Sequence, residues 1–120
     1  GFSPEVLYPG YRLVIPLPSS TNIAVYEPLP GTTVAAGQRL SGVARVFEAN
    51  VNYQLIDDSG REITGEKAVT ASVGAPSFGQ FDTSLQFDQP PAAAAGTLLV
   101  YTRSAKDGSV QDLVEVRISL

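Results

Sequence analysis

A two-residue alternation between positions 81 and 88 constrains this chain more than any other feature of its sequence. One set of side chains is mostly apolar and the other is wholly polar: Phe81, Thr83, Leu85 and Phe87 against Asp82, Ser84, Gln86 and Asp88. Successive side chains of a β-strand point to opposite faces of the sheet, so the segment is predicted to be a strand with one buried face. No helical period of comparable length occurs elsewhere, and the sequence therefore predicts an all-β protein.

Similar short runs continue from residue 22 to the end of the chain and are separated by turn residues. Further strands are expected at 22–26, 39–47, 51–56, 98–103 and 110–120. The run 61–73 is expected to hold two strands, or one strand with a bulge near Gly65. At most one helical turn fits at 92–95, because Pro90-Pro91 and Gly96 bracket it. About seven short strands linked by turns predict an antiparallel β-sandwich.

The N-terminal residues differ from the rest of the chain in their proline content. Six of the nine prolines fall within the first 30 residues. Proline fixes its own φ and lacks a backbone donor, which disfavours a central strand or a helix there. We expect residues 1–21 to be a proline-rich lead segment or linker and residues 22–120 to be the domain. The lead segment also carries apolar residues, so it either packs along an edge of the domain, which we favour, or docks on a partner or on a preceding domain.

Composition removes most catalytic chemistries. The 120 residues include no cysteine and no histidine, which excludes disulfides, thiolate ligands and imidazole bases. Eight basic against 12 acidic side chains give a net charge of -4, which argues against nucleic-acid binding. No apolar stretch is long enough for a membrane-spanning helix. We expect no enzyme activity, no cofactor and no metal.

Three groups of side chains are candidates for a site or for structural turns. Phe47 and Glu48 end a predicted strand; we expect Phe47 to fill the end of the sandwich and Glu48 to accept backbone N–H bonds, the alternative being a binding site. Asp57 and Asp58 with Glu62, and separately Asp107 with Asp112, are possible calcium ligands. The acidic density is low, so we interpret Asp57, Asp58 and Asp107 as residues of glycine turns.

Aromatic and basic residues offer a further surface. Tyr8, Tyr11, Tyr26 and Tyr101 either form an aromatic platform for glycans or a protein, or cover strand edges, the interpretation we favour. The basic residues are scattered among acids, which is typical of a solvated surface, and Arg45 is expected to pair with a carboxylate across strands.

Several residue groups stand in a fixed order between Ile23 and Leu120. They are Ile23-Ala24-Val25 before Pro28-Leu29-Pro30-Gly31; the run Leu40-Ser41-Gly42-Val43-Ala44-Arg45-Val46-Phe47-Glu48; Leu55-Ile56-Asp57-Asp58-Ser59-Gly60; Phe78-Gly79-Gln80-Phe81; and Ser104-Ala105-Lys106-Asp107-Gly108-Ser109. In this order they resemble the immunoglobulin-like domain family of bacterial spore-germination proteins. One departure is Ala49, where the family pattern leads us to expect glycine.

The resemblance implies an immunoglobulin-like β-sandwich that binds and does not catalyse. It implies a setting outside the cytoplasm, in the cell envelope or on the spore surface, with a signal or lipoprotein anchor already removed. The resemblance does not define a ligand; we expect the partner to be another envelope or spore protein, with cell-wall glycan as a second hypothesis and a passive spacer as a third. The oligomeric state does not follow from it.

Overall fold

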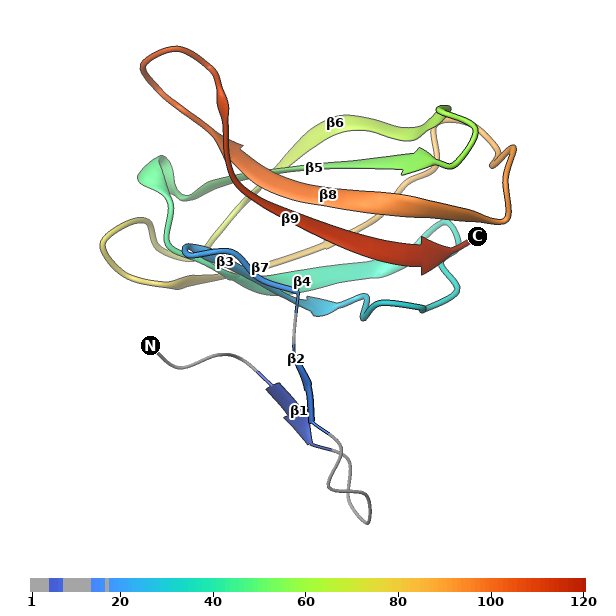
Figure 1. Cartoon of the computed structure of the whole chain (residues 1–120). Coiled ribbons are helices and arrows are strands. Elements are labelled where there is room, and N and C mark those ends of the chain that lie inside the picture. The colour runs from blue at the N-terminus through green and yellow to red at the C-terminus, as the bar shows by residue number, and fades with distance from the viewer. Residues whose placement is uncertain (1–4, 8–13, 17) are drawn as a thin grey trace.

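The computed structural model describes residues 5–7, 14–16 and 18–120, and residues 18–120 form two antiparallel sheets stacked face to face (Figure 1). The three-stranded sheet has the order β3(Ile23–Glu27), β4(Arg39–Ala44), β7(Gly79–Ser84). The four-stranded sheet has the order β6(Glu62–Thr70), β5(Asn50–Asp57), β8(Ala95–Arg103), β9(Val110–Ser119). The predicted seven-stranded sandwich is confirmed.

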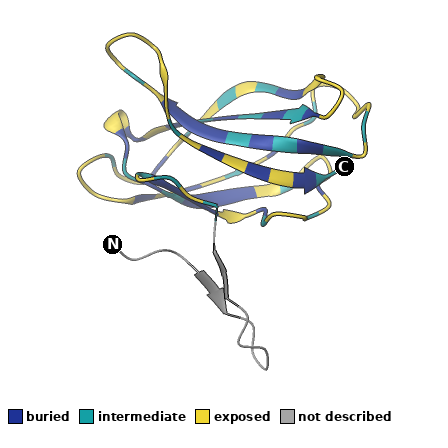
Figure 2. Ribbon diagram, viewed as in Figure 1, coloured by how far each residue is buried: buried dark blue, intermediate teal, exposed yellow. Residues whose placement is uncertain are grey.

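The core lies between the two sheets and is built from the inward members of each alternation (Figure 2). Phe81 and Leu85, the residues that first indicated a strand, are 2% and 0% exposed. They meet Leu98, Val100 and Val116 of the opposite sheet in one apolar cluster. Burial of about a hundred Å² or more of apolar surface on each such side chain is the main stabilising term of a sandwich of this kind.

Two strands are shorter than the sequence predicted. The strand expected over 39–47 ends at Ala44 and is followed by η1(Phe47–Ala49), a single 3-10 turn. The strand expected over 81–88 ends at Ser84 as β7, although Gln86 and Asp88 remain exposed. In both cases the alternation of buried and exposed side chains continues beyond the last residue that pairs with a neighbouring strand. The sequence pattern therefore predicts the burial of side chains better than it predicts the pairing of strands.

The run 61–73 is one strand with an irregularity, which is one of the two expected outcomes. In the register of β5 and β6, Tyr53 pairs with Lys67 whereas Leu55 pairs with Thr64. Two steps along β5 therefore correspond to three along β6, which places one extra residue in the interval that contains Gly65. No helix forms at 92–95.

The end of the lead segment runs along one edge of the sandwich. The carbonyl of Pro18 accepts the N–H of Val25 at 2.9 Å, and the N–H of Ser20 donates to the carbonyl of Ile23 at 2.8 Å. Further upstream, β1(Glu5–Leu7) and β2(Val14–Pro16) pair with each other as a separate antiparallel ladder. Tyr8 and Tyr11, two members of the predicted aromatic platform, lie outside the described residues.

Gly42 lies where the structure leaves no room for a side chain. A Cβ atom at this position would lie 2.1 Å from the carbonyl oxygen of Ala24 and 2.7 Å from Cζ of Phe81. Strand β4 thus passes so close to β3 and to the core aromatic that no side chain fits.

Among the described residues, no helix is both long and apolar enough to cross a membrane.

Candidate functional site: an exposed apolar end of the sandwich

Two loops meet at one end of the sandwich, the left-hand end in Figure 1. One is η1 with the preceding Val46, and the other is the connection between β6 and β7, residues 71–78. The carbonyl of Val46 accepts the N–H of Ala75 at 2.9 Å, and the carbonyl of Ala49 accepts the N–H of Ala71 at 2.8 Å. These backbone bonds hold the two loops in a fixed relation.

The base of the second loop is closed as well. The N–H of Ser72 donates to the carbonyl of Gln80 at 2.8 Å, and the N–H of Gln80 donates to the Ser72 hydroxyl at 2.9 Å. Gly79 packs so closely there that a Cβ atom would lie 2.3 Å from the carbonyl oxygen of Val73. The loop is thus held at its base and also on the side that faces η1.

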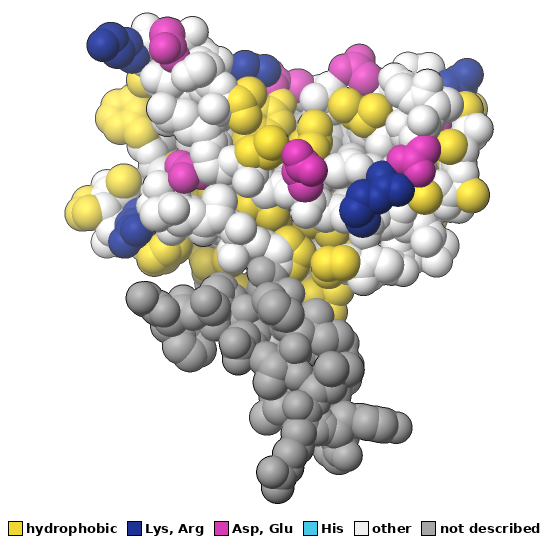
Figure 3. Space-filling model, in the orientation of Figure 1, with side chains coloured by type: hydrophobic (Ala, Val, Ile, Leu, Met, Phe, Trp, Pro, Cys, Tyr) yellow, Lys and Arg dark blue, Asp and Glu magenta, His cyan; other side chains and the backbone are white. Residues whose placement is uncertain are grey.

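Three large apolar side chains project from these two loops. Phe47 is 65% exposed, Phe78 50% and Val73 46%. We refer to Phe47, Val73 and Phe78 together as the end surface. Hydrophobic side chains are visible along the left margin of the space-filling view, over these loops (Figure 3).

The expectation that Phe47 fills the end of the sandwich is wrong, and the backbone explains why. Glu48 and Ala49 both have left-handed φ values, 55° and 59°, so the chain turns sharply directly after Phe47. The turn buries Ala49 and leaves Phe47 outside. The positive φ of Ala49 also accounts for the glycine expected at that position, since glycine adopts this conformation without a steric cost.

Glu48 does not play the structural role that was expected of it. Its side chain is exposed, and within the described part of the chain no N–H donates to its carboxylate. The backbone N–H of Ala49, which the carboxylate was expected to bind, donates to the carbonyl of Val46 at 3.1 Å instead.

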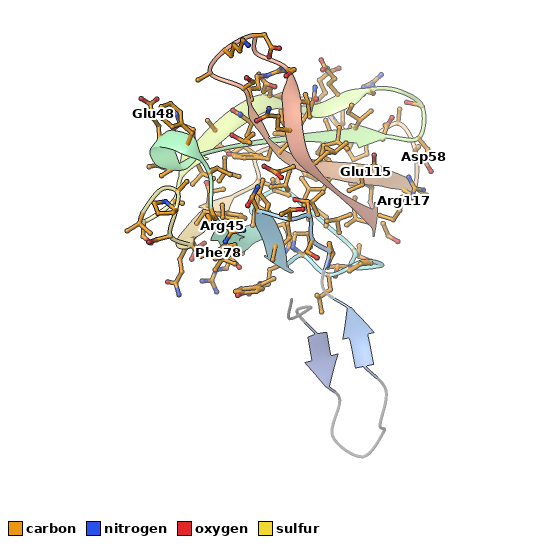
Figure 4. All side chains as sticks on the ribbon, turned by 60° about the vertical axis from the view of Figure 1, so that its left-hand side comes forward. Arg45, Glu48, Asp58, Phe78, Glu115 and Arg117 are labelled. Carbon is orange, nitrogen blue, oxygen red and sulfur yellow. The ribbon has the colours of Figure 1, made fainter. Side chains whose placement is uncertain are left out.

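Arg45 lies beside the end surface and contacts it. Its guanidinium carbon is 4.7 Å from the centroid of the Phe78 ring, and Nε donates to Oδ1 of Asn22 at 3.1 Å (Figure 4). The predicted cross-strand ion pair of Arg45 is not found, because no carboxylate among the described side chains lies within ion-pair distance of it.

Asp57 is a buried carboxylate that organises a turn and a neighbouring loop. It is 3% exposed and accepts the backbone N–H groups of Ser59 at 2.9 Å, Arg61 at 3.0 Å and Ala92 at 2.7 Å. The Ser59 hydroxyl also donates to it at 2.5 Å. This hydroxyl bond, followed by the backbone bonds, lowers the pKa of Asp57 to about 2.

Asp58 faces a different partner from its neighbour. The terminal nitrogens of Arg117 bind its two carboxylate oxygens at 2.7 and 3.0 Å, and this hydrogen bonding lowers the pKa of Asp58 (Figure 4). Glu62 accepts a hydrogen bond from the amide of Gln54. Each of the first three possible calcium ligands therefore has its own separate set of partners, and the three carboxylates do not converge.

The second set of possible calcium ligands also separates. Asp107 accepts the backbone N–H of Ser109 at 3.0 Å, which lowers the pKa of Asp107. Asp112 lies in a bulge of β9 with φ 56° and accepts Nδ2 of Asn22 on both carboxylate oxygens at 3.1 Å. Across the described residues, no three acidic side chains gather in a way that would hold a metal ion.

The two tyrosines of the predicted platform that can be described have unlike surroundings. Tyr26 is 44% exposed, whereas Tyr101 is 3% exposed and its hydroxyl donates to Glu66. Burial, followed by that bond, raises the pKa of Tyr101 to about 12. Tyr101 is therefore a structural residue on the four-stranded sheet and not part of an exposed platform.

Val73 and Phe78 are members of the end surface that the sequence did not single out as site residues. Their position in the sequence could have indicated that they are exposed. Both are large apolar residues in a stretch rich in glycine, proline and serine, residues 72–79, which lacks the alternating pattern of a strand. An apolar residue in such a loop has no core face to occupy.

The sheet order and the fixed loops at the sandwich ends define an immunoglobulin-like β-sandwich. Residues 22–109 match the family described as the immunoglobulin-like domain of bacterial spore germination, so the chain belongs to that family. The matched region includes Arg45 and every residue of the end surface. No curated protein matches the chain.

Proposed function

We propose that this chain is a non-enzymatic binding module of a bacterial cell-envelope protein, working outside the cytoplasm in sporulation or spore germination. Its partner is another envelope or spore protein, which it contacts through the end surface. The observation that carries the proposal is the exposure of Phe47, Val73 and Phe78 together on two loops bonded to each other.

Exposed aromatic residues on loops of fixed conformation are typical of protein interfaces. Phenylalanine is enriched at interface cores, and a handful of anchors of this kind usually supply most of the binding free energy. Because the backbone bonds of Val46 and Ala49 already fix the two loops, little conformational entropy is lost when a partner binds. Sandwich-end loops of immunoglobulin-like domains are well suited to this role.

The state of the carboxyl groups supports a role without catalysis. A glycosidase needs one carboxyl group whose pKa is raised so that it can donate a proton near neutral pH. Among the described carboxyl groups, every shifted pKa is shifted downwards, because hydrogen bonds favour the charged form. These groups are Asp57, Asp58, Glu66, Asp82, Asp88 and Asp107.

Glycan binding is the second candidate, and a shallow hollow on the three-stranded sheet favours it. The hollow is lined in part by Tyr26, Arg39, Gln80 and Asp82. An exposed tyrosine ring offers a face for stacking on a sugar, and the polar neighbours offer hydrogen bonds. This candidate uses a different surface from the end surface, so the two can be separated by mutation.

The test compares three immobilised proteins: the wild-type chain, a Phe47→Ser/Phe78→Ser variant, and Arg39→Gln as a control on the three-stranded sheet. Each is incubated with solubilised spore-envelope proteins, and bound proteins are identified by mass spectrometry. A protein retained by the wild type and the control but lost from the double variant is expected. Equal retention by all three would contradict the proposal.

A second arm addresses glycan and spacer roles. Binding of soluble peptidoglycan fragments to the native state would raise the midpoint of thermal unfolding in a saturable way. A rise in the wild type that is lost in Tyr26→Ala would favour the glycan candidate. No rise, together with no protein retained in the first arm, would favour a passive spacer.

A further inference from the structure

We propose that Arg45 is the carboxylate-binding group of the end surface, and that the partner protein presents an aspartate or glutamate beside an apolar residue. This inference rests on the proposed function and names the chemistry of the partner. The carboxylate would bind the terminal nitrogens of Arg45 while the apolar residue packs on Phe47 and Phe78.

The guanidinium of Arg45 is already oriented in the free protein. Its Nε donates to Oδ1 of Asn22 at 3.1 Å, its Cζ lies over the Phe78 ring at 4.7 Å from the centroid, and its own backbone N–H donates to the carbonyl of Asn22 at 2.7 Å. Nη1 and Nη2 have no hydrogen-bond acceptor among the described residues. A guanidinium fixed in this way retains the planar fork that matches a carboxylate.

The other described arginines differ from Arg45 in this respect. Arg39 binds Asp82 at 2.5 Å, Arg103 binds Glu66 at 2.6 Å, and Arg117 binds Asp58 at 2.7 Å. Arg61 donates to the carbonyl of Pro90 at 3.3 Å. In a chain of net charge -4, Arg45 is thus the described arginine whose terminal nitrogens have no acceptor.

Arg45 and Phe47 face the same side of the chain. Val46 between them is extended, with φ -130° and ψ 155°, and is 3% exposed. Alternate residues of an extended segment point in the same direction, so Arg45 and Phe47 both point away from the core. Glu48 lies apart from Arg45, on another side of η1 (Figure 4).

The oriented guanidinium of Arg45 beside the exposed rings of Phe47 and Phe78 fits a protein carboxylate better than an anionic membrane. A partner that covers Phe47 and Phe78 removes water from Arg45, which strengthens a direct ion pair. Membrane surfaces attract clusters of basic residues, whereas this chain carries an excess of acidic ones. One oriented guanidinium over the Phe78 ring instead offers a bidentate contact of defined geometry.

The test selects peptides from a random phage-displayed library on the full chain and measures their affinities. Selected peptides are expected to carry an acidic residue next to apolar ones. Arg45→Gln should weaken the binding of such a peptide at least about tenfold, and Arg45→Lys should weaken it less, because lysine keeps the charge but not the fork. Arg61→Gln, the matched charge change in the turn between β5 and β6, should alter affinity less than about twofold.

A double-mutant cycle makes the assignment specific. Replacing the acidic residue of the peptide by its amide should cost as much as Arg45→Gln, and the two changes together should cost little more than either alone. Thermal unfolding of each variant shows that the fold is retained. Additive losses, or an unchanged affinity in Arg45→Gln, would overturn the inference.

The outcomes also separate this inference from the proposed function. Apolar peptides without an acidic preference, lost in Phe47→Ser/Phe78→Ser, would leave the end surface as the binding site and remove the role of Arg45. Peptides that bind the double variant as well as the wild type would overturn both. A library that yields no peptide above the level recovered on the double variant would also count against both.

Discussion

The buried carboxylate of Asp57 accepts a hydrogen bond from the backbone N–H of Ala92 at 2.7 Å, although 35 residues separate them in the chain. The same carboxylate binds the N–H groups of Ser59 and Arg61 within its own turn. One side chain therefore joins the turn after β5 to the connection before β8, at the end of the sandwich opposite η1 (Figure 1). We therefore expect the fold to depend on Asp57 more than on its exposed neighbour Asp58.

Asp57→Ala is predicted to lower the midpoint of thermal unfolding by several degrees. The change removes the shared acceptor of the N–H groups of Ser59, Arg61 and Ala92, and with it the link between the turn after β5 and the connection before β8. Asp58→Ala is the matched control, since the Asp58 side chain is 48% exposed and its ion pair lies on the surface. Equal effects of the two substitutions in a calorimetric scan would contradict this role.

The contribution of Asp57 should disappear in acid. Its pKa is lowered from an ordinary 3.8 to about 2 in the folded protein, so the charged form is favoured by folding. The stabilisation is complete above the ordinary pKa and is lost as the pH falls towards 2. The stability gap between the wild type and Asp57→Asn, measured by urea unfolding, should be wide at pH 7 and should narrow below pH 4. A gap that does not change with pH would mean that the charge of the carboxylate is not what stabilises the turn.

Gly42→Ala is predicted to destabilise the domain by more than about 3 kcal/mol, or to prevent folding. The new Cβ would lie 2.1 Å from the carbonyl oxygen of Ala24, a backbone atom that cannot move without displacing β3. Gly65→Ala is the control, because a Cβ there meets only Oδ2 of Asp88, at 3.5 Å. Chemical denaturation of the two variants checks the difference.

Glu48→Gly is predicted to stabilise the domain by about 0.5–1 kcal/mol, because it removes a side chain from a left-handed position, φ 55°. Glu48→Ala should stay within about 0.5 kcal/mol of the wild type, since the described structure shows no donor on the carboxylate. Glu48→Val should destabilise, because β-branched residues tolerate this conformation poorly. A marked loss of stability in Glu48→Ala would mean that the carboxylate has a structural partner.

The sequence predicted those features that depend on local periodicity. The alternation of Phe81 and Leu85 with polar residues identified core positions, and Gly60 and Gly108 marked turns that do have positive φ, 90° and 74°. Both features are set by residues within a few positions of each other, so they can be recognised without knowing the fold.

The candidate site was less predictable because its geometry depends on contacts between distant segments. Asp57 and Asp58 are adjacent in sequence, yet one is bound by Ala92 and the other by Arg117. Phe47 was expected inside because the sequence does not indicate the left-handed turn that follows it: the two residues of that turn are Glu48 and Ala49, and neither is glycine. Arg45 was expected to meet a carboxylate, and its stacking on Phe78 follows only from the position of the second loop.

The end surface itself is tested most directly by photo-crosslinking in spores. A photoreactive phenylalanine analogue is placed in the protein, one site at a time, at Phe47, Phe78, Tyr26 or Gln89, the last being an exposed residue of the connection between β7 and β8. Strong crosslinks to one protein from positions 47 and 78, with weak ones from 26 and 89, are expected. Crosslinks from position 26 or 89 that equal or exceed those from 47 and 78 would contradict the central claim.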